Sequence, residues 1–450
     1  MNQEGGHVGI RRLLHTNRWL WMAPSLLLFW IIGQFDKANI SLVIANRPFQ
    51  EELNLVGRNT ELGGLMSAFF IGYGASVFVW GFLVDRFGPR RCLMFGSAGW
   101  GVALLLMSQA ASLEGLLLAR FLLGVAEGNM WPVSNALTNR WFPAREHSRA
   151  QAFWLTGSTL GTAVGVPVVT ALMLTSGWRG MMIGLAAFSL IPIALFSFLA
   201  NRPADQRGIG TAEVEEIERD AKKHAAVGRM SFGELLRSRS FWLIAACMIV
   251  STTTVFTMIQ WTPSFLVSQR QLPFQTMSRW VTVGYVLATA MMVLGAAIAD
   301  RTMQRARTAA WTCSLFAVAV IPAALLLSPI ASAVLLAALI GASATTAALN
   351  GALLHTLVRP EAIARGTGIY TGVGNFLSAL GPAIFGRLIN ALDGEYWGGF
   401  LYLALLNVAS ATCYFALHRI SARATQPAVP APSLAATPER KPSDLPLSNL

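Results

Sequence analysis

Two stretches of this sequence place charged residues inside segments that are otherwise apolar enough to cross a lipid bilayer. Asp36 and Lys37 are neighbours in "IGQFDKANIS", and Arg120 and Glu127 lie seven residues apart in "ARFLLGVAEG". A charged side chain near the bilayer centre costs about 2.5–3.5 kcal/mol on insertion scales, so it must find a partner on another helix, in water or in a ligand. Charges in such positions are typical of substrate-binding and proton-transfer sites.

Helical spacing limits which of these charges can meet. Arg120, Gly124 and Glu127 follow an i, i+4, i+7 pattern and therefore share one helix face. The two charged groups are roughly 10 Å apart along the axis, too far for a direct pair, and Gly124 between them leaves room for another group to approach. Asp36 and Lys37 point about 100° apart on their helix. We expect the two helices to face each other across a wet cavity, with Asp36 neutralising Arg120 or Lys37 when no substrate is bound. The alternative is a fixed ion-pair network that only holds the helices together.

The composition supplies the elements that must position these residues. The chain is 54% hydrophobic and 12% charged, whereas ordinary soluble domains are about 25% charged. Apolar runs of roughly 20 residues, the length that crosses a bilayer, recur twelve times. The sequence therefore predicts an all-α membrane protein with twelve transmembrane helices, near 19–45, 61–84, 92–110, 113–137, 150–172, 180–200, 241–267, 280–299, 309–328, 331–357, 367–391 and 398–418.

The basic residues predict the orientation. Most of the 34 Lys and Arg residues fall on one side if the N-terminus is cytoplasmic, as the positive-inside rule requires. The net charge of +12 is thus a topology signal, and nucleic-acid binding is not expected. We expect a multi-pass protein of the cell inner (plasma) membrane with both termini cytoplasmic. The four cysteines lie in apolar segments without CxxC spacing, so no disulfide, metal or cofactor is expected.

An internal repeat indicates that the two halves are duplicated. "GFLVDRFGPRR" closes the second segment and "GAAIADRTMQRAR" closes the eighth, so that Asp85–Arg86 and Asp300–Arg301 lie 215 residues apart. Two pseudo-symmetric six-helix halves would place a substrate site between them near the middle of the bilayer. The same offset relates glycine and proline pairs of the fifth and eleventh segments, Gly157 and Pro167 with Gly372 and Pro382.

The predicted organisation has five parts. Residues 1–18 form a cytoplasmic tail, 19–200 and 240–419 form the two bundles, 201–239 form a cytoplasmic loop, and 420–450 form a disordered cytoplasmic tail. The loop contains "TAEVEEIERDAKKHAA", which predicts a solvated surface helix. We interpret the loop as a connector between the bundles rather than as a regulatory element. The final tail is rich in Pro, Ala and Ser, a composition typical of disorder.

Several motifs resemble known transporters. The pattern G-x-x-x-D-R-x-G-x-R-R after the second segment resembles the signature loop of the major facilitator superfamily. Three longer stretches resemble the anion:cation symporter family of that superfamily, which includes carriers of sugar acids, tartrate, phthalate and related organic anions. These stretches are "GYGASVFVWGFLVDRFGPRR", "ARFLLGVAEGNMWPVSNALTNRWFPAREHSRA" and "SGWRG".

The resemblance implies roles for the buried charges. By analogy with the family, Asp36 and Glu127 take part in proton coupling, while Lys37 and Arg120 hold the substrate anion. The family usually has Arg where this chain has Lys37. Lysine carries a point charge, whereas arginine presents a planar fork.

Three further polar residues are candidates for lining the substrate site. Tyr73 in "FFIGYGAS" and Asn375 in "GVGNFLSALGP" resemble family residues of the second and eleventh helices. Gln260 in the seventh segment is a further candidate for lining or gating the site. Ordinary packing is the alternative for each of them.

The signature loop has a conformational role in the superfamily. There, Gly81 would allow close approach of a neighbouring helix, and the negative charge of Asp85 would meet a helix N-terminus. This contact would help to hold the outward-open state. Arg86 belongs to the same loop, and Asp300 and Arg301 occupy the equivalent place in the second half.

Taken together, the sequence predicts a secondary active transporter that imports a small organic anion, a carboxylate or a sulfonate, by proton symport with alternating access. The predicted partners are the anion, the proton and the lipid bilayer, and the protein is expected to be a monomer. The alternative is a drug or metabolite exporter of the same superfamily, although "GTAVGVPVV" lacks the fuller Gly-Pro pattern of such exporters. A facilitator without ion coupling and a receptor that borrows the fold are further alternatives. An enzyme is not expected, because no His lies beside a plausible nucleophile or metal set.

Overall fold

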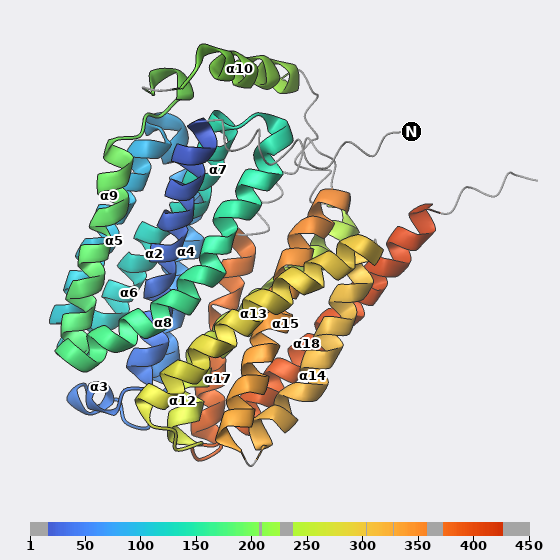
Figure 1. Ribbon diagram of the computed structural model, residues 1–450. Helices are drawn as coiled ribbons and strands as arrows, with labels where there is room; N and C mark the ends of the chain where they lie inside the picture. Colours follow the sequence, from blue (N-terminus) through green and yellow to red (C-terminus); the bar gives the residue numbers. More distant parts are fainter. Residues whose placement is uncertain are drawn as a thin grey trace, which may run out of the picture.

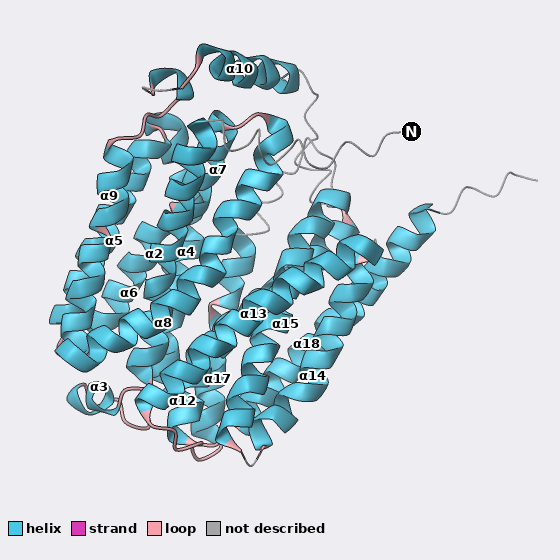
Figure 2. Ribbon diagram, viewed as in Figure 1, coloured by secondary structure: helices cyan, strands magenta, loops and turns pink. Residues whose placement is uncertain are grey.

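The computed structural model describes residues 17–206, 209–225, 237–302, 304–326, 328–357 and 372–425. This part of the chain is almost entirely α-helical, as the sequence predicts, and Figure 2 shows only short loops between the helices. Backbone polar groups in lipid must be satisfied within the segment that carries them, which is why apolar runs of this length fold as helices.

Two groups of helices make up the molecule (Figure 1). The first group consists of α2 (Asn17–Ile44), α3 (Arg47–Glu52), α4 (Asn59–Phe87), α5 (Pro89–Gln109), α6 (Leu113–Glu127), α7 (Met130–Trp141), α8 (Ala144–Phe188) and α9 (Leu190–Ser197). A 3₁₀ turn, η1 (Pro203–Asp205), and helix α10 (Thr211–Ala225) follow at one end of this group. The second group consists of α12 (Arg239–Ser268), α13 (Phe274–Thr302), α14 (Arg305–Leu325), α15 (Pro329–Leu357), α17 (Leu380–Ala391) and α18 (Trp397–Thr425).

Ten helices within the described ranges are long and apolar enough to cross a membrane. The predicted fifth and sixth segments lie in one helical stretch, Arg149–Ser197, and are counted together. The chain turns within this stretch at Gly177, whose φ of 68° and ψ of 178° suit only glycine. The predicted fourth segment is divided between α6 and α7, because Gly128 and Asn129 interrupt the helix.

Small residues bring the helices of the first group close together. A Cβ atom on Gly124 of α6 would overlap the backbone carbonyl of Phe69 on α4, and one on Gly72 would overlap that of Phe121. Backbone-to-backbone packing through small residues is typical of membrane helices. The group that approaches Gly124 is therefore a neighbouring helix.

Helix α10 forms over the segment for which the sequence predicts a surface helix, and it docks on the first group. Arg18 at the start of α2 pairs with Glu146 of α8 at 2.9 Å, with Glu216 of α10 at 3.3 Å and with Glu213 of α10 at 3.6 Å. One nearly buried guanidinium thus joins three elements.

The two groups meet at the end remote from α10 (Figure 1). Asn390 of α17 accepts hydrogen bonds from the side chain of Asn59 at 2.9 Å and from its backbone N–H at 3.2 Å. Gln260 of α12 donates to the backbone carbonyl of Leu62 at 3.1 Å. On the opposite flank Thr170 of α8 and Ser278 of α13 share a hydrogen bond of 2.7 Å.

Candidate functional site

Asp36, Lys37, Arg120 and Glu127 form one buried cluster, called here the charge cluster. Asp36 and Lys37 lie in the inner part of the 28-residue helix α2, while Arg120 and Glu127 lie on α6. Their relative exposures are 1%, 7%, 0% and 0% in that order. The wet cavity that the sequence predicts around these groups is therefore closed in this structure.

Lys37 and Glu127 make a direct ion pair across the two helices. The Nζ atom of Lys37 lies 2.7 Å from Oε2 of Glu127 and also donates to the backbone carbonyl of Gly33 at 3.2 Å. The second carboxylate oxygen of Glu127, Oε1, is buried and has no hydrogen-bond partner among the described residues. Glu127 therefore holds a cation with one oxygen and keeps the other free to accept a donor.

Asp36 has a different set of partners from the one expected. Its carboxylate accepts hydrogen bonds from the indole N–H of Trp100 on α5 and from the side-chain amide of Asn39, the latter at 3.0 Å. The prediction that Asp36 neutralises Arg120 or Lys37 is wrong for this structure. Lys37 is already paired with Glu127, and the two neutral donors occupy both oxygens of Asp36.

Arg120 makes only weak contacts with uncharged acceptors. Its guanidinium donates to the backbone carbonyls of Leu65 at 3.3 Å and of Asp36 at 3.4 Å, and to the sulfur of Met66 at 3.7 Å. The Cζ atom lies 5.1 Å from the centre of the Phe69 ring. Within the described residues no carboxylate pairs with Arg120. Because a buried cation is costly unless it is paired, this group is the strongest candidate in the molecule for binding an anion.

Aromatic rings of α4 cover the two cations. Nζ of Lys37 lies 5.5 Å from the ring centre of Phe69 and 5.9 Å from that of Tyr73. The structure thus brings Tyr73 beside the charge cluster. Phe69 contacts both cations, and the π face of such a ring attracts a cation in a desolvated site.

The two other predicted lining residues lie on the second group of helices. Gln260 is fully buried and donates to α4 through its amide nitrogen, while its Oε1 atom has no hydrogen-bond partner in the described ranges. Asn375 is also buried, next to Phe376, whose backbone lies against Gly74 of α4. No hydrogen bond of the described residues joins either amide to the charge cluster.

The signature loop lies at the end of α4. Asp85 and Arg86 are exposed there, and Gly88, with a φ of 84°, makes the turn into α5. The close helix approach predicted at Gly81 is wrong for this structure, because a Cβ atom there would meet nothing within 4 Å. In the second half Arg301 is exposed, and the side chain of Asp300 lies outside the described residues.

Sequence reasoning missed three residues of the site: Trp100, Asn39 and Phe69. Asn39 could have been found from its i+3 spacing to Asp36. Trp100 stands in "GSAGWG", a run of small residues in which one large ring with a donor is conspicuous. Phe69 has no distinguishing signal, because phenylalanine is common throughout the apolar segments.

Comparisons with known proteins agree with this fold. The model of the Major Facilitator Superfamily matches residues 26–382. The chain is 30% identical to the probable sulfoacetate transporter SauU of Cupriavidus necator, over 62% of this chain and 64% of that protein. It is 28% identical to the probable L-galactonate transporter of Escherichia coli, over 61% of this chain and 60% of that protein. The matches thus span less than two thirds of these relatives.

A solved structure has the same fold. It is the inward-facing, unoccupied crystal structure of a bacterial homologue of the human lysosomal transporter Spinster. Its TM-score with this chain is 0.71 at 16% sequence identity, covering 89% of this chain and 97% of that one. From the family match over most of its length, we conclude that this chain belongs to the major facilitator superfamily.

Proposed function

We propose that this protein is a secondary active transporter that imports a small organic anion, a carboxylate or a sulfonate, together with protons by alternating access. The observation that carries the proposal is the fully buried Arg120, which pairs with no carboxylate of the described residues and lies beside the Lys37–Glu127 ion pair. The two relatives, a probable sulfoacetate transporter and a probable L-galactonate transporter, support the same class of substrate.

The chemistry follows from an exchange of partners. An incoming anion would pair with Arg120 and compete with Glu127 for Lys37. A proton on Glu127 would release Lys37, so that anion and proton enter together without leaving an extra buried charge. Asp36 remains a second proposed proton site. A proton arriving there would displace a hydrogen bond from Trp100 or Asn39.

We assign the remaining proposed residues to two roles. Tyr73, Gln260 and Asn375 would line the route of the substrate between the two groups of helices. The signature loop and its counterpart in the second half would hold the outward-open state. The residues involved would be Gly81, Asp85, Arg86, Asp300 and Arg301. In the present structure a Cβ atom on Gly81 would meet nothing within 4 Å, so a neighbouring helix has room to approach this position in the outward-open state.

The proposed topology has twelve transmembrane helices in two pseudo-symmetric halves and both termini in the cytoplasm of a monomer in the inner membrane. It counts Arg149–Ser197 as two spans and α6 with α7 as one. The end at which Asn59 bonds to Asn390 is then the outer end. Alternating access would require these contacts to break when the protein opens outward.

Uptake into proteoliposomes tests the function. Radiolabelled sulfoacetate and galactonate are offered with an inward proton gradient, with an inward sodium gradient, and with a protonophore. We expect accumulation of at least one anion only with the proton gradient. Uptake without accumulation would indicate a facilitator, and proton-dependent extrusion of cationic drugs would indicate the exporter. Either result would overturn the proposal.

Binding is measured separately by thermal shift of the purified protein. Arg120→Ala should lose stabilisation by the transported anion, since it removes the buried cation that pairs with no carboxylate in the described part of the chain. Arg387→Ala, at an exposed position on α17, is the matched control and should keep it. Stabilisation of the wild-type protein by lipophilic cations and by no small organic anion would contradict the assignment.

A further inference from the structure

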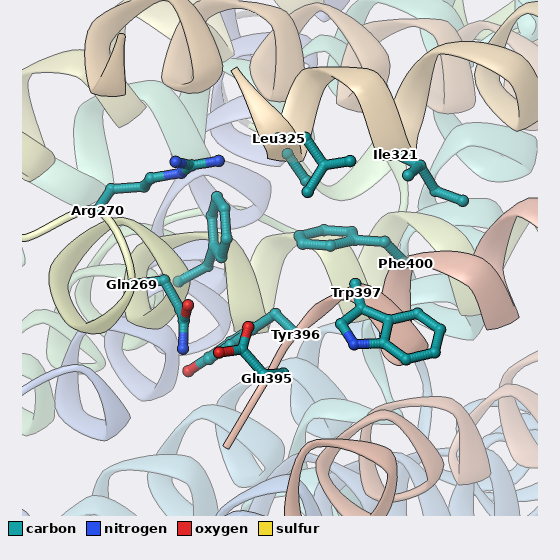
Figure 3. Close-up of a pocket in the computed structure, with 10 residues that line it drawn as sticks. Gln269, Arg270, Ile321, Leu325, Glu395, Tyr396, Trp397 and Phe400 are labelled. Atoms are coloured by element: carbon teal, nitrogen blue, oxygen red, sulfur yellow. The ribbon is translucent and has the colours of Figure 1, made fainter. Parts of the chain in front are cut away.

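A second site lies at the outer end of the second group of helices, on elements that do not contribute to the charge cluster. A pocket of about 360 Å³ opens between the ends of α12 and α14 and the start of α18 (Figure 3). Its lining combines charged, amide, aromatic and aliphatic side chains, among them Gln269, Arg270, Leu325, Glu395, Tyr396 and Phe400.

The cation of this pocket lacks an acidic partner. Nε of Arg270 is buried and donates to no acceptor of the described residues, and Cζ of the guanidinium lies 5.3 Å from the centre of the Phe265 ring. No ion pair of the described residues includes Arg270. An arginine held over a ring and left without an acceptor fits a phosphate or carboxylate group.

The pocket is also lined by an acidic side chain, Glu395, which is separated from Arg270. Figure 3 shows Arg270 on one side and Glu395, next to Gln269, on the other. Glu395 is exposed and has no ion pair in the described part of the chain. The amide of Gln269 is held by the backbone carbonyl of Gly394 at 3.1 Å. A pocket with one positive and one negative end suits a zwitterion better than a simple anion.

The remaining surface is apolar and fits a lipid. Leu325 and Trp397 are both exposed at the ends of membrane-spanning helices, where tryptophan commonly marks the bilayer boundary. The floor is rigid, because the Tyr396 hydroxyl bonds to Ser264 at 2.8 Å and its ring packs against Phe265 at 5.5 Å between ring centres. A ligand here can keep its charged end in the pocket and its acyl chains beside Leu325.

We propose that this pocket binds the headgroup of phosphatidylethanolamine. The phosphodiester would pair with Arg270, and the primary ammonium would donate to Glu395. Phosphatidylcholine has no N–H to donate to Glu395. Phosphatidylglycerol would bring a net negative charge beside Glu395 without an ammonium to compensate it.

Native mass spectrometry of the purified full-length protein tests this proposal. The three lipids, with identical acyl chains, are added in equal amounts, and the lipid that stays bound is counted. We expect preferential retention of phosphatidylethanolamine. Arg270→Gln and Glu395→Gln should each reduce it about fivefold, the effect of losing one charge-assisted hydrogen bond at a partly exposed site. Arg279→Gln, an exposed change on α13 outside the pocket lining, is the control and should have no effect.

Equal retention of the three lipids, or equal losses in the pocket variants and the control, would overturn the proposal. Soluble glycerophosphoethanolamine is tested in parallel. If it binds as tightly as the lipid, the site recognises a free phosphodiester, and the proposal of a membrane-lipid site is overturned. The headgroup comparison uses only the wild-type protein and therefore decides the question even if a variant does not fold.

Discussion

The Lys37–Glu127 ion pair offers the most direct test of how charge is used inside this protein. The perturbation is Glu127→Gln, which keeps the shape of the side chain and an oxygen acceptor but removes the negative charge. The pair is tight and dry, with 2.7 Å between Nζ and Oε2 and with side chains 9% and 0% exposed. Lys37 would then remain a buried cation without the one charged partner that the described residues give it.

The expected loss of stability follows from this geometry. Removing one partner of a buried ion pair lowers the free energy of unfolding by about 3–5 kcal/mol. We expect the lower end, about 3 kcal/mol, because the Gln amide oxygen can still accept from Lys37. Lys37→Met should cost a similar amount. The double variant should cost much less than the sum, giving a coupling energy of about 2–3 kcal/mol.

The stabilities are measured by unfolding in mixed micelles as a complete double-mutant cycle. The Arg47–Glu51 pair, 65% and 58% exposed, is the matched control, and Glu51→Gln should change stability by less than about 1 kcal/mol. Proteoliposomes carrying Glu127→Gln should lose proton-driven accumulation and retain counterflow exchange. Additive single effects would refute the energetic reasoning, and accumulation by the Gln variant would refute the coupling role of Glu127.

Two further predictions concern the outer end. Gly63→Ala places a methyl group against the backbone carbonyl of Pro382, so it should force α4 and α17 apart and raise the thiol labelling of a cysteine introduced at that end of α17, whereas Gly64→Ala, which would make only an ordinary contact with Leu117 at 3.8 Å, should have no effect. An indole hydrogen bond from Trp178 is the main cause that lowers the pKa of Glu52 from its ordinary 4.5. The ionised Glu52 carboxylate should therefore stabilise the fold above pH 4.5, and this stabilisation should be lost as the pH falls below that value. Trp178→Phe removes the hydrogen bond, so the melting temperature of this variant should fall less over the same acidic range.

The apolar segments were predictable because their length is set by the bilayer rather than by tertiary contacts. Asp36, Lys37, Arg120 and Glu127 stand out for the same reason, since each is an expensive exception within an apolar run. The turn between the fifth and sixth segments follows the same logic. The gap 173–179 between the two predicted segments contains Gly177, where the backbone leaves helical geometry and reverses.

The partners of the charges were not predictable. Which cation faces which carboxylate depends on how α2, α5 and α6 are rotated against one another, and that rotation follows from packing between backbones far apart in sequence. The approach of Phe69 to Gly124 is one such contact. It has no local signature, and it brings an uncharged ring to both cations.

The sequence by itself determined that the chain crosses a membrane, that its motifs resemble the superfamily, and that four charges lie where lipid would exclude them. Only the tertiary structure decided that Glu127 rather than Asp36 pairs with Lys37, because Trp100 on α5 and Asn39 already occupy the Asp36 carboxylate. The physical reason is that hydrophobicity acts residue by residue, whereas an ion pair requires two side chains at about 3 Å, a distance that only the packed helices can fix.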